Sequence, residues 1–237
     1  MFSEAKVTEI YCLTDDFCKE FARNQENYML KYTKKNAKHR NKPNRMSDAE
    51  IILIMILFHS GGYRCFKHFY LEYVCKHLAH LFPRRVSYNR FVELEKEVLF
   101  PLTIFIKTVL LGTCTGISFV DSTPLRVCRN QRIHIHKTFE GLATRGKCSM
   151  GWFFTKIKNN MKNVLMNIND EILIRKRAVI ETVNDELKNI AQIEHSRHRS
   201  FNNFIANALS AIAAYCFFDK KPAIEVEFVN DGQLALF

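Results

Sequence analysis

Apolar residues recur at spacings of three and four through the first part of the chain, which predicts a series of helices. Ser47 and Glu50 form an S-x-x-E capping box directly ahead of the apolar run Ile51–Phe58. Gly61 and Gly62 follow that run and are typical of a helix end. The pattern therefore predicts a buried helix between the capping box and the two glycines.

Two further helices are expected after this one. The first runs from about Arg64 to Phe82 and is followed by a turn at Pro83. Ser87 can cap the second, whose first turn carries Tyr88, Asn89 and Arg90. A recognition helix presents its base contacts in that turn, so the arrangement suggests a helix-turn-helix-like DNA-binding region. The alternative is a helical hairpin that serves only packing.

The pattern changes near residue 113. The apolar run from Gly116 to Val120 ends in Asp121, as expected for a buried strand with a carboxylate at its tip, and a second strand is expected at Cys148–Phe154. Later, the spacing of Ile180, Val183, Leu187 and Ile190 predicts an amphipathic helix with a buried stripe, and Ile205–Phe218 predicts a closing helix. The predicted fold class is α+β, with a helical region at residues 1–112 and an α/β core at residues 113–237.

The charge of the chain indicates which class of partner it binds. Lys and Arg outnumber Asp and Glu by 35 to 24, which gives a net charge of +11 and favours a polyanionic partner such as nucleic acid. Residues 31–45 carry cations and no acid, and we expect them to form an exposed linker that touches DNA. A merely solvated loop is the alternative. The cations assigned to DNA in this linker are Lys34, Lys35, Lys38 and Arg40.

Several protein classes are not favoured. The eight cysteines form no CxxC pair and no signal peptide begins the chain, so we expect reduced thiols in the cytoplasm. The apolar runs are too short or too interrupted for a membrane span. Nothing indicates a small-molecule substrate.

One helix face combines an acid with two cations. On an ideal helix with 100° per residue, Arg177, Glu181 and Lys188 lie within about 40° of one another. A carboxylate can bind a metal ion while the cations hold phosphate, so this face suits a site that grips both metal and a phosphodiester. A surface ladder of ion pairs is the alternative.

The motifs around these residues resemble those of bacterial insertion-sequence transposases, and most closely the family numbered nine-eight-two. The segment Phe119–Pro124, with the later Gly141–Phe154, is similar to the first-aspartate region of that family. The stretch Lys176–Lys188 resembles its glutamate helix and has the R-x3-E-x6-K spacing of the wider group, although Ile174 stands where a tyrosine is usual.

This resemblance implies an RNase H-like core in which three acids hold two Mg²⁺ or Mn²⁺ ions for DNA cleavage and strand transfer. Asp121 and Glu181 correspond to the first and third acids, and Arg177 and Lys188 to residues that hold DNA. The implied partners are the terminal inverted repeats of the element, target DNA and a second copy of the chain. The implied location is the bacterial cytoplasm, associated with the nucleoid.

The second catalytic aspartate has no clear counterpart. Between Asp121 and Glu181 the only acids are Glu140, Asp170 and Glu171, and the chain passes near residues 154–155 directly into sequence that resembles the part beyond the missing acid. We therefore expect an internal deletion, an incomplete core and a transposase that is inactive or impaired. A non-catalytic DNA-binding remnant, acting as a repressor or poison subunit, is the alternative function. An RNA-binding or scaffold role would require the resemblance to be accidental.

Overall fold

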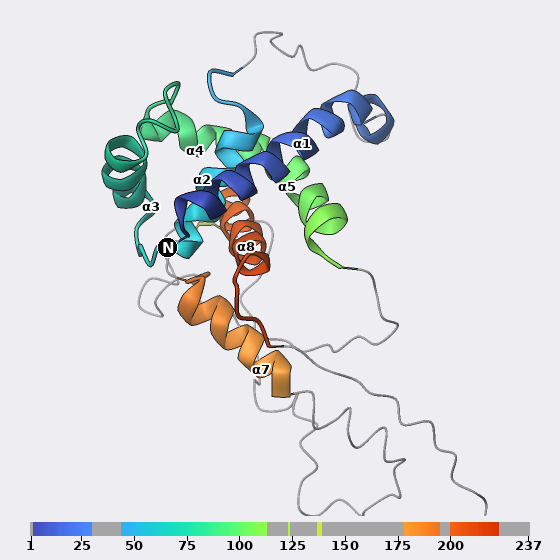
Figure 1. The fold of residues 1–237 in the computed structure, drawn as a ribbon, viewed down its shortest axis with the longest axis vertical. Coiled ribbons are helices and arrows are strands. Elements are labelled where there is room, and N and C mark those ends of the chain that lie inside the picture. The colour runs from blue at the N-terminus through green and yellow to red at the C-terminus, as the bar shows by residue number, and fades with distance from the viewer. Residues whose placement is uncertain are drawn as a thin grey trace, which may run out of the picture.

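The computed structural model describes residues 2–29, 44–112, 123, 137–138, 178–194 and 200–222. Every regular element within these ranges is a helix, and most of the helices are gathered in one bundle (Figure 1). The strands expected at residues 116–121 and 148–154 lie outside the described residues. Within the ranges described, none of the helices combines the length and apolarity that a membrane crossing requires.

The helix α2 (Asp48–Ser60) forms the centre of the bundle. Its predicted capping box is confirmed, because Ser47 Oγ accepts from Glu50 N at 3.2 Å and Glu50 Oε2 accepts from Ser47 N at 2.7 Å. Gly61 ends the helix as predicted. Every residue from Ile51 to Phe58 is at most 3% exposed. A helix that is apolar on all sides must be covered on all sides, and each large aliphatic side chain buried in this way contributes about 1.5–3 kcal/mol.

Three helices cover α2. They are α1 (Glu4–Met29), α4 (Tyr88–Glu97) and α8 (Phe201–Cys216), and α5 (Leu99–Phe105) completes the packing against α1 and α8. The chain continues from α5 into a short π-helix, η2 (Ile106–Leu110). All of these helices contribute side chains to one hydrophobic core.

The second predicted helix has a different form from the one expected. It begins as α3 (Phe66–His68), continues as a wider π-helix, η1 (Phe69–His77), and ends ahead of the expected limit at Phe82. Tyr70 in η1 is fully buried, and its hydroxyl donates to the carbonyl of Val86 at 2.6 Å. This bond fastens the segment to the start of α4, where Ser87 accepts from Arg90 N at 3.5 Å as the predicted cap.

The closing helix α8 packs into the same core as the amino-terminal helices. Ser200 caps it by accepting from Asn203 N at 3.3 Å, and its small residues Ala213 and Ala214 are fully buried against the bundle. In Figure 1 it runs beside α2 through the middle of the bundle. The division of the chain into two regions at residue 112 stays a prediction. The helix α8 follows residue 112 in the sequence, but it packs against α2, α4 and α5, which precede that residue.

The glutamate-bearing helix consists of α7 (Ala178–Asp185) and a π-helical turn, η4 (Glu186–Ile190). The predicted buried stripe was wrong at its end, because Ile190 is 53% exposed whereas Ala191 is fully buried. A π turn holds more residues than an α turn, so side chains beyond it no longer follow the 3.6-residue period. The amide of Ala191 bonds to the carbonyl of Glu186 five residues earlier, as this turn requires.

Candidate functional site

Of the sequence-predicted site residues, Glu181 and Lys188 lie in the described glutamate helix, and Tyr88, Asn89 and Arg90 lie in α4. Glu181 is exposed in the first turn of α7. The remaining predicted residues lie outside the described residues: Asp121, Arg177, Lys34, Lys35, Lys38 and Arg40.

Lys188 links the glutamate helix to the segment that follows Asp121. Its Nζ donates to Thr123 Oγ1 at 2.5 Å, across 65 residues of sequence. The same ammonium lies 3.9 Å from a carboxylate oxygen of Glu194, and 28% of the Lys188 side chain is exposed. A hydrogen bond from a charged group is stronger than one between neutral groups. The described structure therefore brings the residue two positions beyond Asp121 against the helix that carries Glu181.

The turn after η4 is held by two side chains of the bundle. His59, 2% exposed at the end of α2, has its Nδ1 2.6 Å from the carbonyl oxygen of Ala191. Asn207 of α8 donates from Nδ2 to the carbonyl of Ile193 at 2.9 Å. Between them Gln192 has a φ of 53°, a left-handed conformation in which a residue other than glycine is strained. The bundle thus fixes where the glutamate helix ends.

The first turn of α4 has two different environments. Tyr88 is half-buried, its ring lies 6.3 Å from that of Phe66, and Lys67 Nζ lies 5.9 Å above it. Asn89 is exposed. Tyr88 therefore packs against the α3 segment, whereas Asn89 faces solvent.

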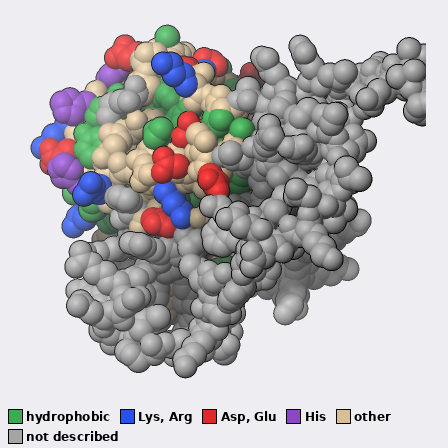
Figure 2. All heavy atoms as spheres, turned by 90° about the horizontal axis from the view of Figure 1, so that it is seen from below, with side chains coloured by type: hydrophobic (Ala, Val, Ile, Leu, Met, Phe, Trp, Pro, Cys, Tyr) green, Lys and Arg blue, Asp and Glu red, His purple; other side chains and the backbone are tan. Residues whose placement is uncertain are grey.

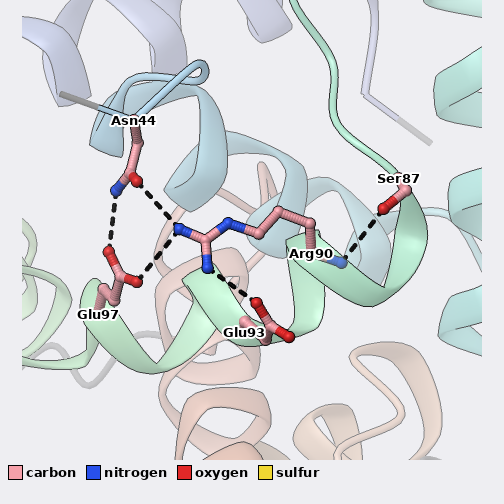
Figure 3. Close-up of polar contacts among 5 residues, drawn as sticks. All are labelled: Asn44, Ser87, Arg90, Glu93 and Glu97. Atoms are coloured by element: carbon pink, nitrogen blue, oxygen red, sulfur yellow. Dashed lines mark hydrogen bonds and ion pairs between the residues drawn. The ribbon is translucent and has the colours of Figure 1, made fainter. Parts of the chain in front are cut away.

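Arg90 is held in a polar network (Figure 3). Its Nη1 lies 2.8 Å from Glu93 Oε2 and its Nη2 lies 3.7 Å from Glu97 Oε1. Nη2 also donates to Asn44 Oδ1 at 3.2 Å, and Asn44 Nδ2 donates to Glu97 Oε2 at 2.9 Å. The hydrogen bond to Glu93 raises the pKa of Arg90. Two carboxylates thus face this guanidinium, and a DNA phosphate or base would have to compete with them.

The described residues do not provide a complete metal centre. They contain no group of three or more His, Cys, Asp or Glu side chains that could hold a metal ion. Glu181 is the only member of the expected acid set among them, and the other acids considered above lie outside the described residues.

Comparison with known proteins supports one class of protein for this site. Residues 111–155 and 154–201 match a family model described as a transposase DDE domain. No curated protein and no solved structure matches the chain significantly. The match supports a DDE transposase, a class whose core is RNase H-like and which generally uses divalent metals. The matched residues include both Asp121 and Glu181.

Three residues of this site were not predicted from the sequence, namely His59, Asn207 and Thr123. His59 is the one polar side chain that interrupts the buried face of α2 at its end, which was the available signal. Asn207 is likewise a buried polar residue of α8, together with Ser210. A buried polar group must find a partner, but the sequence does not tell which one.

Proposed function

We propose that the chain is a DDE transposase of a bacterial insertion sequence, of the family numbered nine-eight-two, whose ancestral activity is to cut the ends of the element and join them to target DNA. The observation that carries this proposal is the domain match over residues 111–201, which contains Asp121 and Glu181. The contact between Lys188 and Thr123 supports it, because it joins the two segments in which these acids lie. The partners are then the terminal inverted repeats, target DNA and a second copy of the chain, at the bacterial nucleoid.

In this proposal Asp121 and Glu181 hold Mg²⁺ or Mn²⁺. Such ions, when bound, supply charge stabilisation for in-line displacement at phosphorus. Arg177 and Lys188 position the DNA strands by their charge, and the Thr123 contact keeps the Lys188 ammonium on the side of the helix that faces the first-aspartate segment. Two carboxylates do not match the donor set that two Mg²⁺ ions require.

We therefore propose that this copy is inactive or severely impaired through an internal deletion. The family match supports this, because it falls into two segments that meet at residues 154–155, where the block carrying the second aspartate is expected to be missing. Loss of strands from a sheet also leaves backbone groups unpaired, which weakens the core.

The test is metal-dependent cleavage of DNA that carries the element's own end. The purified chain is incubated with Mg²⁺ or Mn²⁺, alongside Asp121→Ala, Glu181→Ala and, as a matched exposed control, Glu93→Ala. We expect no cleavage by any variant. Cleavage that is lost in Asp121→Ala and Glu181→Ala but kept in Glu93→Ala would contradict the impairment and support the transposase assignment. Cleavage that survives Asp121→Ala and Glu181→Ala would contradict the assignment itself.

A second candidate is a non-catalytic DNA-binding remnant that represses transposition or poisons assembly. The observation that favours it is the closure of the helical bundle by α8, since the buried residues of this core, among the described ranges, come from residues 7–106 and 206–217. The test compares binding of the whole chain to the terminal repeat and to a shuffled repeat. Equal affinity for both would contradict this candidate.

A further inference from the structure

Positive charge in the described bundle is concentrated in one segment. Residues 64–85, between α2 and α4, carry five Lys or Arg against a single acid, Glu72. The neighbouring helices have the opposite balance: α1 has six acids against three cations, α2 has two acids and no Lys or Arg, and α4 has three acids against two cations. The charge of the bundle is therefore segregated by element.

The fold turns this segment outward. Its apolar side chains Phe69, Tyr70 and Val74 are fully buried in the core, so its polar side chains face solvent. Arg64, Lys67, Lys76 and Arg84 are all exposed. Figure 2 shows His, Lys and Arg side chains, with a few acidic ones between them, gathered at the edge of the described surface where α3 lies in Figure 1. We call these four cations and the surface around them the 64–85 surface.

The one acid of residues 64–85 already forms an ion pair. Glu72 lies 2.5 Å from Lys76 Nζ, and both side chains are more than 40% exposed. The hydrogen bond to Lys76 lowers the pKa of Glu72, and the nearby His68 and His77 lower it further. An exposed ion pair of this kind is worth little, so Lys76 can exchange its partner for a phosphate.

The 64–85 surface borders a groove that is also lined by a cation from another part of the chain. Arg84, at its end, and Arg45, the last cation of residues 31–45, line one groove together with the start of α2. Asp48 and Glu50 lie in the same groove and mark the border of the positive surface. Arg45 and Arg84, which are distant in sequence, thus lie in the same groove.

On this basis we propose that the 64–85 surface binds the phosphate backbone of duplex DNA, in a role distinct from that of the first turn of α4. This inference rests on the proposed function for the identity of the polyanion. Backbone contacts need exposed, exchangeable cations, which this surface has. Arg90, by contrast, lies between Glu93 and Glu97, so α4 contributes little net charge to phosphate binding.

The experiment measures duplex DNA binding by the whole chain as a function of salt. One variant replaces the four cations of the 64–85 surface, as Arg64→Gln, Lys67→Gln, Lys76→Gln and Arg84→Gln. The matched control removes the same net charge from exposed sites elsewhere, as Lys19→Gln, Arg23→Gln, Lys96→Gln and Lys107→Gln. Fluorescence anisotropy of a labelled duplex of arbitrary sequence is followed between about 50 and 200 mM salt.

We expect the 64–85 variant to bind duplex DNA at least about tenfold more weakly than the parent chain. The slope of log binding constant against log salt concentration should become shallower by about 0.9 for each phosphate contact removed. The control should keep the slope of the parent chain. Equal losses in both variants, or an unchanged slope in the 64–85 variant, would overturn the proposal. If the fourfold variant fails to fold, Lys76→Gln and Arg84→Gln are tested singly, and each should lower the slope by about one.

Failure of the proposed function gives a different result. If the parent chain binds no duplex at the lowest salt, DNA is not its partner and both proposals are overturned. Binding of anionic phospholipid vesicles in place of duplex has the same meaning. If the parent binds duplex and only the control variant weakens it, the DNA partner stands and the 64–85 surface alone is rejected.

Discussion

Nδ1 of His59 lies 2.6 Å from the carbonyl oxygen of Ala191, 132 residues further along the chain. Since a carbonyl oxygen only accepts, Nδ1 carries the proton and donates it. This bond joins the most buried helix of the bundle to the end of the glutamate helix. The position of Glu181 is thus tied to the bundle through the backbone of the turn after η4.

Replacing His59 should destabilise the contact between α2 and the turn after η4. We expect His59→Ala to leave the Ala191 carbonyl without its partner and to lower the free energy of unfolding by at least about 1–3 kcal/mol. Urea denaturation measures this, and hydrogen exchange should show faster exchange at residues 186–193. The exposed His80→Ala is the control and should change neither quantity. Unaltered hydrogen exchange at residues 186–193 in His59→Ala would contradict the role of this hydrogen bond in holding the turn after η4.

The contact between Lys188 and Thr123 can be tested by a double-mutant cycle. Lys188→Met and Thr123→Val each remove one partner, and the free energies of unfolding of the two single variants and the double variant are compared. We expect a coupling energy of about 1 kcal/mol, because the donor is charged and part-buried. Additive effects would mean that the contact does not hold the two segments together.

Glu95 makes the stability of the bundle depend on pH. It is 8% exposed in α4, and burial raises its pKa to about 8, against an ordinary value of 4.5. Between these values the unfolded chain releases the proton while the folded chain keeps it, so stability falls as pH rises. Above about pH 8 both states are ionised and this contribution becomes constant.

Glu95→Gln should remove this pH dependence. The variant is expected to be more stable than the parent by up to a few kcal/mol near pH 7–8 and to match it near pH 4. Urea denaturation across this range measures the effect, with the exposed Glu93→Gln as control. A parent chain whose stability does not fall from pH 5 to pH 8 would contradict the prediction.

The bundle should not fold without α8. A chain that ends at residue 112 lacks Ala206, Ala213, Ala214 and Phe217, whose burial completes the core around α2. The apolar surface left open on α2 would cost several kcal/mol. We expect this fragment to bind a hydrophobic dye and to unfold without a cooperative transition. A chain that ends at residue 222 keeps α8 and should retain the transition of the full chain. Cooperative unfolding of the shorter fragment would show that residues 1–112 suffice.

Local signals in the sequence were enough for α2 and for the start of α4. The capping box at Ser47, the glycine at the end of α2 and the serine cap of α4 all act within a few residues, and each was confirmed. The cap of α8 at Ser200 was not predicted. The resemblance that pointed to Asp121 and Glu181 was also local, and the family match supports its class. The catalytic roles of Asp121 and Glu181 both stay predictions.

Tertiary structure decided which of these elements meet. The π turn at η4 exposes Ile190 and buries Ala191, which a fixed period of 100° per residue could not anticipate. The partner of His59 lies 132 residues away, and no pattern in the sequence relates the two. The sequence by itself determined the presence of helices, the caps of α2 and α4 and the motifs of a transposase domain, because those depend on neighbouring residues. The packing of α8 into the bundle and the position of Arg45 and Arg84 in one groove depend on contacts between distant segments, and only the folded chain brings those segments together.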